Sequence, residues 1–315
     1  MGNGFEEGFT LRAPGLDDLD AVLALIRACE EVDEGNAEST ADDLRTNWRL
    51  LGDLARDAWL ISTLDEPIVG YANIWQRVEG IRFESDGYTH PEFRGRGIGT
   101  TLVRAVEERA REQAQDGATL RTAVNHANDE ARRLLENEEY SPVRSYWRMV
   151  IDFESPPASP QWPDGVLTRP YEPERDERAV HTMIQQAFAD NYDYSPLPLE
   201  AWRAAIIERD DFDPSLVRLA TYASDIVGSA LCFRYDGHGW VRTLAVLEDW
   251  RRRGVGMGLL RSAFAEFYRR GQRSAGLVVD SFNRTGAKEF YERAGMRVER
   301  QHDGYEKVLG ARNRK

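Results

Sequence analysis

The sequence predicts an α/β fold with a mixed sheet, built twice in tandem. The chain has 315 residues, and domains of this kind take roughly 100–200 residues each. A short, polar, proline-rich stretch divides it almost in half, and the two halves repeat the same order of expected elements. We therefore expect one domain over residues 1–154, a linker over residues 155–161 and a second domain over residues 162–315.

Each half opens with a strand and an amphipathic helix, followed by a second helix and three consecutive strands. In the first half we expect these elements at 9–13, 17–30, 41–50, 58–63, 68–77 and 81–89. In the second half we expect them at 166–169, 173–190, 199–209, 216–222, 226–235 and 239–246. Turn-forming residues separate the strands.

A glycine-rich loop, a long helix and a buried strand come next in each half. The buried strand is expected at 119–124 and at 276–280, and a shorter helix and a final pair of strands then close each copy. The apolar residues of the long helix fall on one face, which indicates packing against the sheet. This order predicts a mixed sheet with helices on both faces.

The loop before the long helix carries the same motif, Arg-x-x-Gly-x-Gly, in both halves. Its residues are Arg94, Gly95, Arg96, Gly97, Ile98, Gly99 and Thr100 in the first half, and Arg251, Arg252, Arg253, Gly254, Val255, Gly256 and Met257 in the second. Glycines let the backbone approach a ligand closely, and the helix N-terminus adds partial positive charge. Nearby arginines neutralise phosphate. The two loops therefore predict pyrophosphate sites, although a single Gly-x-Gly is often only a turn.

Two other phosphate-binding loops do not fit. A Walker loop needs Gly-Lys-Ser/Thr, which neither half contains. A dinucleotide fingerprint opens a βαβ unit, whereas these loops follow a run of consecutive strands.

This pattern resembles the GCN5-related N-acetyltransferase (GNAT) family, most closely over residues 246–257 and 279–296. The resemblance implies acetyl-CoA as co-substrate and a small-molecule amine as acceptor. The cofactor-binding residues that it implies in the second copy are Leu244, Ala245, Val246, Arg251, Arg252, Arg253, Gly254, Val255, Gly256, Met257 and Asn283. The first-half loop from Arg94 to Thr100 is the matching site. The two-copy plan is similar to that of mycothiol synthase, but the motifs do not assign its substrate to this chain.

By the same resemblance, Tyr291 points at the thioester sulfur and is the catalytic residue. A phenol with an ordinary pKa of ~10 can protonate a leaving thiolate as a general acid. The alternative is an aromatic side chain that only packs between helix and sheet. In the first half, Leu135 aligns with Tyr291, and Glu139 replaces Gly295, so we expect the helix stop to be lost. We therefore expect the first copy to be degenerate and to bind acyl-CoA weakly or not at all.

The general base and the acceptor stay open at this point. Glu84 and Asp86 are carboxylate candidates in the first half, His238 and Glu248 flank the matching strand in the second, and an ordered water is a further alternative. The connection at residues 188–198 mixes aromatic and acidic residues, which suits a cationic acceptor, although it is equally typical of a polar loop.

Composition limits the remaining functions. The net charge of −13 and the pI of about 5.0 leave no basic domain for nucleic acid. The five histidines show no metal-ligand spacing, and no apolar run approaches the ~20 residues of a membrane span. Without a recognisable signal peptide, and with Cys29 and Cys232 as buried thiols, we expect a cytoplasmic monomer or homodimer. A non-catalytic acyl-CoA sensor or scaffold and a protein acetyltransferase are the alternative functions.

Overall fold

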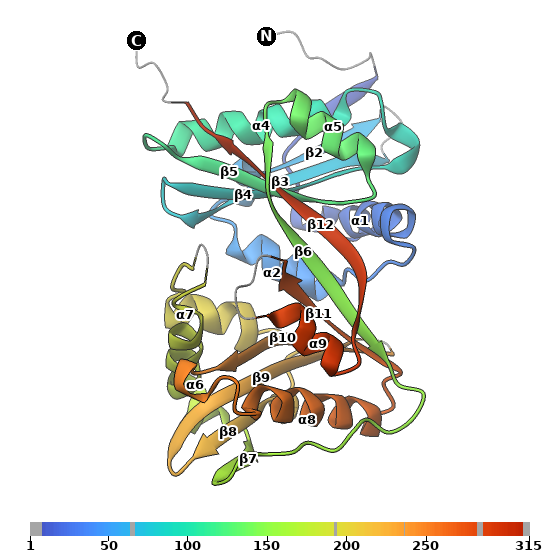
Figure 1. The fold of residues 1–315 in the computed structure, drawn as a ribbon. Helices are drawn as coiled ribbons and strands as arrows, with labels where there is room; N and C mark the ends of the chain where they lie inside the picture. Colours follow the sequence, from blue (N-terminus) through green and yellow to red (C-terminus); the bar gives the residue numbers. More distant parts are fainter. Residues whose placement is uncertain (1–7, 64–66, 192–193, 236, 282–285, 311–315) are drawn as a thin grey trace. The chain divides into compact units, whose positions relative to one another are not determined.

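The computed structural model describes residues 8–63, 67–191, 194–235, 237–281 and 286–310. These residues belong to two compact units (Figure 1). The first unit contains the chain up to Ser145 and again from Arg300 onward, and the second unit contains Tyr146 to Glu299. Each unit holds one of the two glycine loops.

The first unit is a mixed sheet with seven flanking helical segments among its described residues. Its strands are β1 (Phe9–Arg12), β2 (Ala58–Thr63), β3 (Ile68–Val78), β4 (Arg82–Thr89), β5 (Thr119–Asn125), the start of β6 (Ser141–Asp152) and most of β12 (Arg297–Val308). Its helices are η1 (Leu16–Asp18), α1 (Leu19–Glu34), α2 (Ala41–Leu50), α3 (Leu54–Asp57), η2 (Pro91–Phe93), α4 (Ile98–Gln113) and α5 (Asp129–Asn137). Strands β1 to β4 pair antiparallel in order, β4 and β5 pair parallel, and residues 302–308 of β12 pair antiparallel with β5.

Helices cover both faces of this sheet, as the sequence predicted (Figure 1). Leu25 of α1 and Trp48 of α2 pack with Tyr71 of β3 on one face. Ile98 and Leu102 of α4 belong to a separate cluster on the other face, together with Ala72 of β3. Neighbouring strand residues point to opposite faces, so β3 contributes to both cores. Full burial of each large apolar side chain stabilises the fold by roughly 1.5–3 kcal/mol.

The second unit repeats this order. Its strands are β7 (Val166–Pro170), β8 (Arg218–Tyr222), β9 (Asp225–Tyr235), β10 (His238–Val246), β11 (Ser274–Asp280) and the later part of β6. Its helices are α6 (Pro173–Phe188), α7 (Leu199–Trp202), the π-helical η3 (Arg203–Ile207), η4 (Pro214–Leu216), η5 (Glu248–Trp250), α8 (Val255–Arg269) and α9 (Ala287–Arg293). Strands β7 to β10 pair antiparallel, β10 and β11 pair parallel, and residues 146–152 of β6 pair antiparallel with β11.

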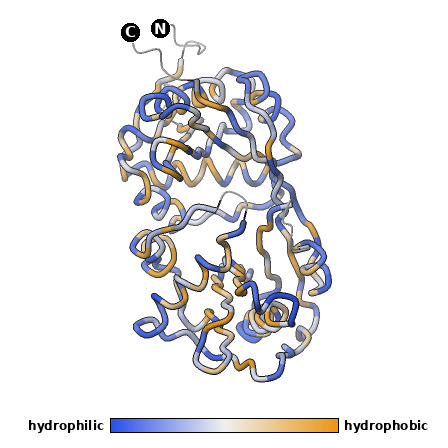
Figure 2. The backbone as a smooth tube through the Cα atoms, turned by 60° about the vertical axis from the view of Figure 1, so that its left-hand side comes forward, coloured by the Kyte–Doolittle hydropathy of each residue, from blue (hydrophilic) through white to orange (hydrophobic). Residues whose placement is uncertain are grey.

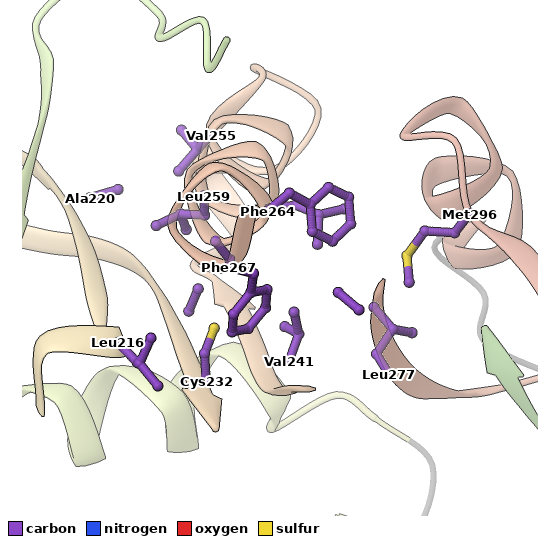
Figure 3. Close-up of a cluster of buried hydrophobic side chains, with 14 of the residues drawn as sticks. Leu216, Ala220, Cys232, Val241, Val255, Leu259, Phe264, Phe267, Leu277 and Met296 are labelled. Atoms are coloured by element: carbon purple, nitrogen blue, oxygen red, sulfur yellow. The ribbon is translucent and has the colours of Figure 1, made fainter. Parts of the chain in front are cut away.

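The core of the second unit lies between α8 and the sheet (Figure 3). The labelled side chains from α8 are Val255, Leu259, Phe264 and Phe267, which gather with Cys232, Val241, Leu277 and Met296. Figure 2 shows hydrophobic residues along the strands and hydrophilic residues at many helix turns and loops. The burial of these α8 side chains confirms the apolar helix face that the sequence predicted.

Two expectations about secondary structure are wrong. Each half ends in one strand of 12 residues, β6 or β12, rather than in a pair of strands. The second helix of the second half is also not one regular helix, because α7 ends at Trp202 and continues as the π-helical segment η3. Among the described residues, no helix is both long and apolar enough to cross a membrane.

Candidate functional site

In both units the two parallel strands next to the glycine loop separate. The pairing of β4 with β5 runs from Arg82 to Ser85, although β4 continues to Thr89. The pairing of β10 with β11 likewise ends at Trp240, although β10 continues to Val246. Backbone N–H and C=O groups need partners. The separated strand ends therefore offer backbone hydrogen-bonding groups to a ligand beside each loop.

The first glycine of each motif shapes the entry into the helix. Gly97 and Gly254 immediately precede α4 and α8, with φ of 80° and 96°. This left-handed conformation favours glycine because a side chain would be strained. The turn leaves the first N–H groups of each helix at its exposed end, where they can bind an anion.

The second glycine of the first motif lets the following short helix pack on the loop, because a Cβ at Gly99 would lie 2.8 Å from Cδ1 of Leu134 in α5. In the second motif a Cβ at Gly256 would lie 3.4 Å from Cζ of Phe290 in α9, which is an ordinary van der Waals contact. In both units the short helix that carries Leu135 or Tyr291 therefore lies next to the glycine loop.

The leading arginines bind protein groups. Arg94 donates to both carboxylate oxygens of Asp33, at 2.8 and 2.9 Å. Arg251 donates to the backbone carbonyls of Val246 and Ala187, at 3.2 and 2.5 Å. Arg94 thus links its loop to the C-terminal end of α1, and Arg251 links its loop to the C-terminal end of α6. Their expected role in neutralising phosphate stays a prediction.

The other loop arginines take a similar position in both units. Arg96 lies over the ring of Phe93 at 4.9 Å, and Arg253 lies over the ring of Trp250 at 5.3 Å. Such stacking orients a guanidinium at the start of the helix. Arg252 adopts a φ of 57°, at the position that Gly95 occupies in the first loop with a φ of 75°.

A cavity of about 610 Å³ opens beside the glycine loop of the first unit. Its lining comes from α1, the loop-proximal end of β4, the glycine loop, α4, β5 and α5, and includes Asp33, Asp86, Gly87, Tyr88, Thr89, Gly97, Thr100, Val124, Asn128, Leu135 and Tyr140. This cavity gives the first copy room for a ligand. The expectation that the first copy binds acyl-CoA weakly or not at all stays a prediction.

The alignment of Leu135 with Tyr291 agrees with the backbone. The Leu135 carbonyl accepts from the N–H of Tyr140 at 2.9 Å, and the Tyr291 carbonyl accepts from the N–H of Met296 at 3.1 Å. The expected loss of the helix stop in the first copy is wrong. Glu139 takes the left-handed conformation with a φ of 66°, where the second copy has Gly295, so α5 still ends in the same way.

Tyr291 packs on the apolar core of the second unit, with its ring 5.0 Å from that of Phe290. Burial raises the pKa of Tyr291 to about 12, because the phenolate would lose its hydration. The hydroxyl therefore stays protonated at neutral pH and can act as a proton donor. Asn283, expected beside the pantetheine, lies outside the described residues.

The base candidates lie in different surroundings. His238 is at the opposite end of β10 from the glycine loop, roughly 25 Å away along the strand, and bonds to Ser274 Oγ at 2.7 Å. Asp86 instead lines the large cavity. Burial, together with the charge of Glu84, raises the pKa of Asp86 to about 6.

A second, smaller cavity of about 40 Å³ lies on the other side of β4. It is lined by Ile26, Ser39, Thr40, Asp43, Leu44, Asn47, Tyr71, Asn73, Asp86 and Tyr88. Asp86 and Tyr88 line both cavities. The sequence did not single out Asp43, Asn47 or Asn73, although an asparagine inside the apolar strand β3 was a usable signal. Among the described residues, no group of His, Cys, Asp or Glu side chains is arranged to hold a metal ion.

The sequence profile of the acetyltransferase (GNAT) family matches this chain over residues 19–137 and again over residues 153–296. Each match spans one separated pair of strands and one glycine loop. The chain belongs to the GNAT family. It is therefore an acetyl-CoA-dependent N-acetyltransferase with two GNAT domains in tandem, as the sequence predicted.

Relatives in this family include proteins named mycothiol acetyltransferase. The one from Thermobispora bispora is 32% identical over 213 residues, which cover 65% of this chain and 70% of the relative. The one from Salinispora tropica is 29% identical over 313 residues, 94% of each chain.

Solved GNAT structures match the whole chain. A GCN5-related N-acetyltransferase from Sphaerobacter thermophilus has a TM-score of 0.83 at 34% identity, covering 97% of both chains. A tandem GNAT protein from the clavulanic acid biosynthesis pathway has a TM-score of 0.75 at 14% identity, covering 96% of this chain and 99% of the other, and shows the shared fold.

Proposed function

We propose that the chain transfers the acetyl group of acetyl-CoA to the amine of a small molecule. The observation that carries this proposal is made in the first domain, where a compact, polar cavity beside β4 adjoins the large cavity at the glycine loop. At about 40 Å³ it has room for a small group rather than for a length of peptide. A protein acetyltransferase would instead need a peptide-wide groove.

We further propose that the second domain catalyses the transfer at its own glycine loop, with Tyr291 as general acid. The amine nitrogen attacks the acetyl carbon, the C–N bond forms and the C–S bond breaks. The Tyr291 hydroxyl then donates its proton to the departing sulfur and recovers one from solvent. One feature supports this role, namely the packing of α9 next to the glycine loop through Phe290.

In the second domain we propose that acetyl-CoA lies along Leu244 to Val246 and on the loop from Arg251 to Met257. The start of α8 would bind the pyrophosphate through backbone N–H groups. We place the activity in the cytoplasm of the host cell, in a monomer or homodimer. Both cysteines, which are buried free thiols, are compatible with a reducing compartment.

The test is release of the CoA thiol by the purified full chain in the presence of an amine panel. The panel should include the amine precursor of mycothiol, because the relatives carry that name. We expect Tyr291→Phe to lower kcat by about 10²-fold and to leave KM for acetyl-CoA unchanged, because the phenol acts only in the transition state.

Tyr268→Phe is the matched control, since Tyr268 lies on α8 and packs on Phe153 away from the loop. Equal kcat values for wild type and Tyr291→Phe would contradict the role of Tyr291. Binding of acetyl-CoA without turnover of any amine would indicate the sensor or scaffold, and acetylation of peptides alone would indicate a protein acetyltransferase.

A further inference from the structure

We propose that Arg261 of α8 binds the 3′-phosphate of CoA, so that the second domain selects the phosphorylated carrier over its 3′-dephospho form. The inference rests on the acetyl-CoA site proposed above at the loop before α8, and it adds the residue that determines which carrier is accepted. In the first domain the equivalent arginine, Arg104, is neutralised by the carboxylate of Glu138.

The place of Arg261 on α8 is the first argument. Arg261 follows Gly254, the residue before the helix, by seven positions, which is almost two full turns, so the two lie on the same side of the helix about 10 Å apart along its axis. Side chains on a helix lean toward its N-terminus, and the long arginine therefore extends back toward the glycine loop. Arg261 is half-buried, on the side of α8 turned away from the core residues Leu259 and Phe267 (Figure 3).

The chemistry of CoA is the second argument. The molecule carries a pyrophosphate and, on the 3′ carbon of the same ribose, a separate phosphate with a charge of about −1.5 to −2 at pH 7. The N-terminus of α8 can take the pyrophosphate, but its field falls off within the first turn, so a cation further along the helix stabilises the third phosphate better. The planar guanidinium of an arginine matches the oxygens of a phosphate with two parallel hydrogen bonds.

Arg261 is free to make this contact. Among the residues that the structure describes, its guanidinium has no hydrogen bond and no ion pair. The positions three and four residues away along α8 hold Met257, Gly258, Phe264 and Ala265, none of which carries a charge. No neighbour on the helix surface therefore compensates the positive charge of Arg261, and an anion is the ligand that it stabilises.

The first domain offers the third argument, because it holds the same arginine in a neutralised state. Arg104 follows Gly97 by seven residues, the spacing that Arg261 has in the second domain. Arg104 donates to both carboxylate oxygens of Glu138, at 3.1 and 2.7 Å. A phosphate at this position of the first domain would have to displace Glu138, and would be repelled by its charge.

The second domain has no carboxylate at the position of Glu138. Glu139 and Gly295 end α5 and α9 in the same left-handed conformation, so the residues just before them, Glu138 and Ala294, are equivalent. The methyl group of Ala294 cannot pair with a cation. The same basic position is thus neutralised in the first domain and left open in the second.

The arginines of the two loops show the same contrast. Arg94 of the first loop is paired with Asp33. In the described part of the chain, Arg251, Arg252 and Arg253 of the second loop form no ion pair with a carboxylate. The second loop therefore keeps an uncompensated positive field, which favours a carrier with three phosphate groups over one with two.

Selection by Arg261 acts on the binding of the carrier. Acetyl-CoA and acetyl-3′-dephospho-CoA share the thioester, the pantetheine and the pyrophosphate, so the reacting atoms are the same in both. Loss of the contact with the 3′-phosphate should therefore raise KM for acetyl-CoA and leave kcat unchanged. An arginine that is only solvated at the surface would change neither value.

Calorimetry on the purified full chain, with acetyl-CoA and acetyl-3′-dephospho-CoA as ligands, tests the proposal. We expect wild type to bind acetyl-CoA about 10-fold more tightly, because the 3′-phosphate adds a charge-assisted contact, and this preference should shrink as ionic strength increases. Arg261→Met should bind both carriers with the affinity that wild type shows for the 3′-dephospho form. Arg269→Met is the matched control, since Arg269 ends α8 far from the loop and pairs with Glu266, and it should keep the preference.

Two substitutions of Ala294 carry the first-domain arrangement into the second domain. Ala294→Glu provides a carboxylate for Arg261 and should abolish the preference for acetyl-CoA. Ala294→Gln adds similar bulk without the charge and should keep the preference. Ala294 packs partly on the core of the second unit, so equal melting temperatures of the two variants show that both are folded alike. Equal loss of the preference in both would overturn the proposal that charge decides at this position.

Equal affinity of wild type for the two carriers would overturn the proposal, and so would a preference that survives Arg261→Met. Turnover of the amine panel separates this result from the function proposed above. If wild type prefers acetyl-CoA by the expected factor but acetylates no amine, the role of Arg261 stands and the proposed transfer fails. If wild type acetylates an amine with the same KM for both carriers, the transfer stands and the role of Arg261 fails. Absence of acetyl-CoA binding in wild type would overturn both.

Discussion

Replacement of Asp86 by Asn should make the fold more stable at alkaline pH, because the native carboxylate is held in a cavity without a cation. Its pKa moves from 3.8 to about 6 on folding. At 1.36 kcal/mol per unit, this shift of about two units corresponds to an upper bound of roughly 3 kcal/mol. Contact with water in the cavities should reduce it to about 1–2 kcal/mol.

The sign follows from the two pKa values. Below about pH 4 the carboxyl is protonated in both folded and unfolded chains, so it costs nothing. Above about pH 6 the folded chain carries the unpaired charge, and the full cost is present. The free energy of unfolding of wild type therefore loses this amount between about pH 4 and pH 6, whereas that of Asp86→Asn does not.

Urea denaturation followed by tryptophan fluorescence, at pH 4 and at pH 8, measures this difference. We expect the advantage of Asp86→Asn over wild type to grow by about 1–2 kcal/mol from pH 4 to pH 8. Asp42→Asn controls for net charge. The same difference between Asp86→Asn and wild type at both pH values would refute the reasoning that Asp86 is desolvated and unpaired.

Three further predictions concern stability. Glu139→Gly should raise the free energy of unfolding by about 1 kcal/mol, because residue 139 is left-handed, and a lower melting temperature would contradict this. Gly239→Ala should lower the free energy of unfolding by about 1–3 kcal/mol, since its Cβ would lie 2.5 Å from the ring of Phe267. Gly310→Ala is the control, because its Cβ meets nothing within 4 Å and its free energy of unfolding should not change. Equal urea midpoints for the two variants would show that the packing argument fails. Lys307→Met should cost about 2 kcal/mol, because buried Glu107 loses a charged donor at 2.8 Å. A wild-type urea midpoint would argue against this ion pair.

Local patterns in the sequence predicted most of the elements. The expected helix at 41–50 and the expected strand at 58–63 have the bounds of α2 and β2. Both are marked by short-range signals. Thr40 and Asp43 form a helix N-terminus, and a short continuous run of apolar residues, Ala58 to Ile61, marks the strand. The glycine loops were also recognisable, because their function depends on consecutive residues.

Features that join distant parts of the chain were not predictable in the same way. Arg94 meets Asp33 across 61 residues, and Arg251 meets the carbonyl of Ala187 across 64. The small cavity combines residues of α1, α2, β3 and β4, and no spacing in the sequence relates them. The last strand, β12, pairs with β5 of the first domain, so the first compact unit is not continuous in sequence.

Binding of acetyl-CoA at the glycine loop of the second domain is the central claim, and calorimetry on matched loop variants tests it most directly. Thr100→Glu and Met257→Glu each place a carboxylate in the first turn of α4 or α8, where it suits the helix but repels pyrophosphate. We expect Met257→Glu to lose acetyl-CoA binding, and Thr100→Glu to keep it, because the first copy is expected to bind weakly or not at all. Binding by Met257→Glu with the affinity of wild type would contradict the assignment of the second loop.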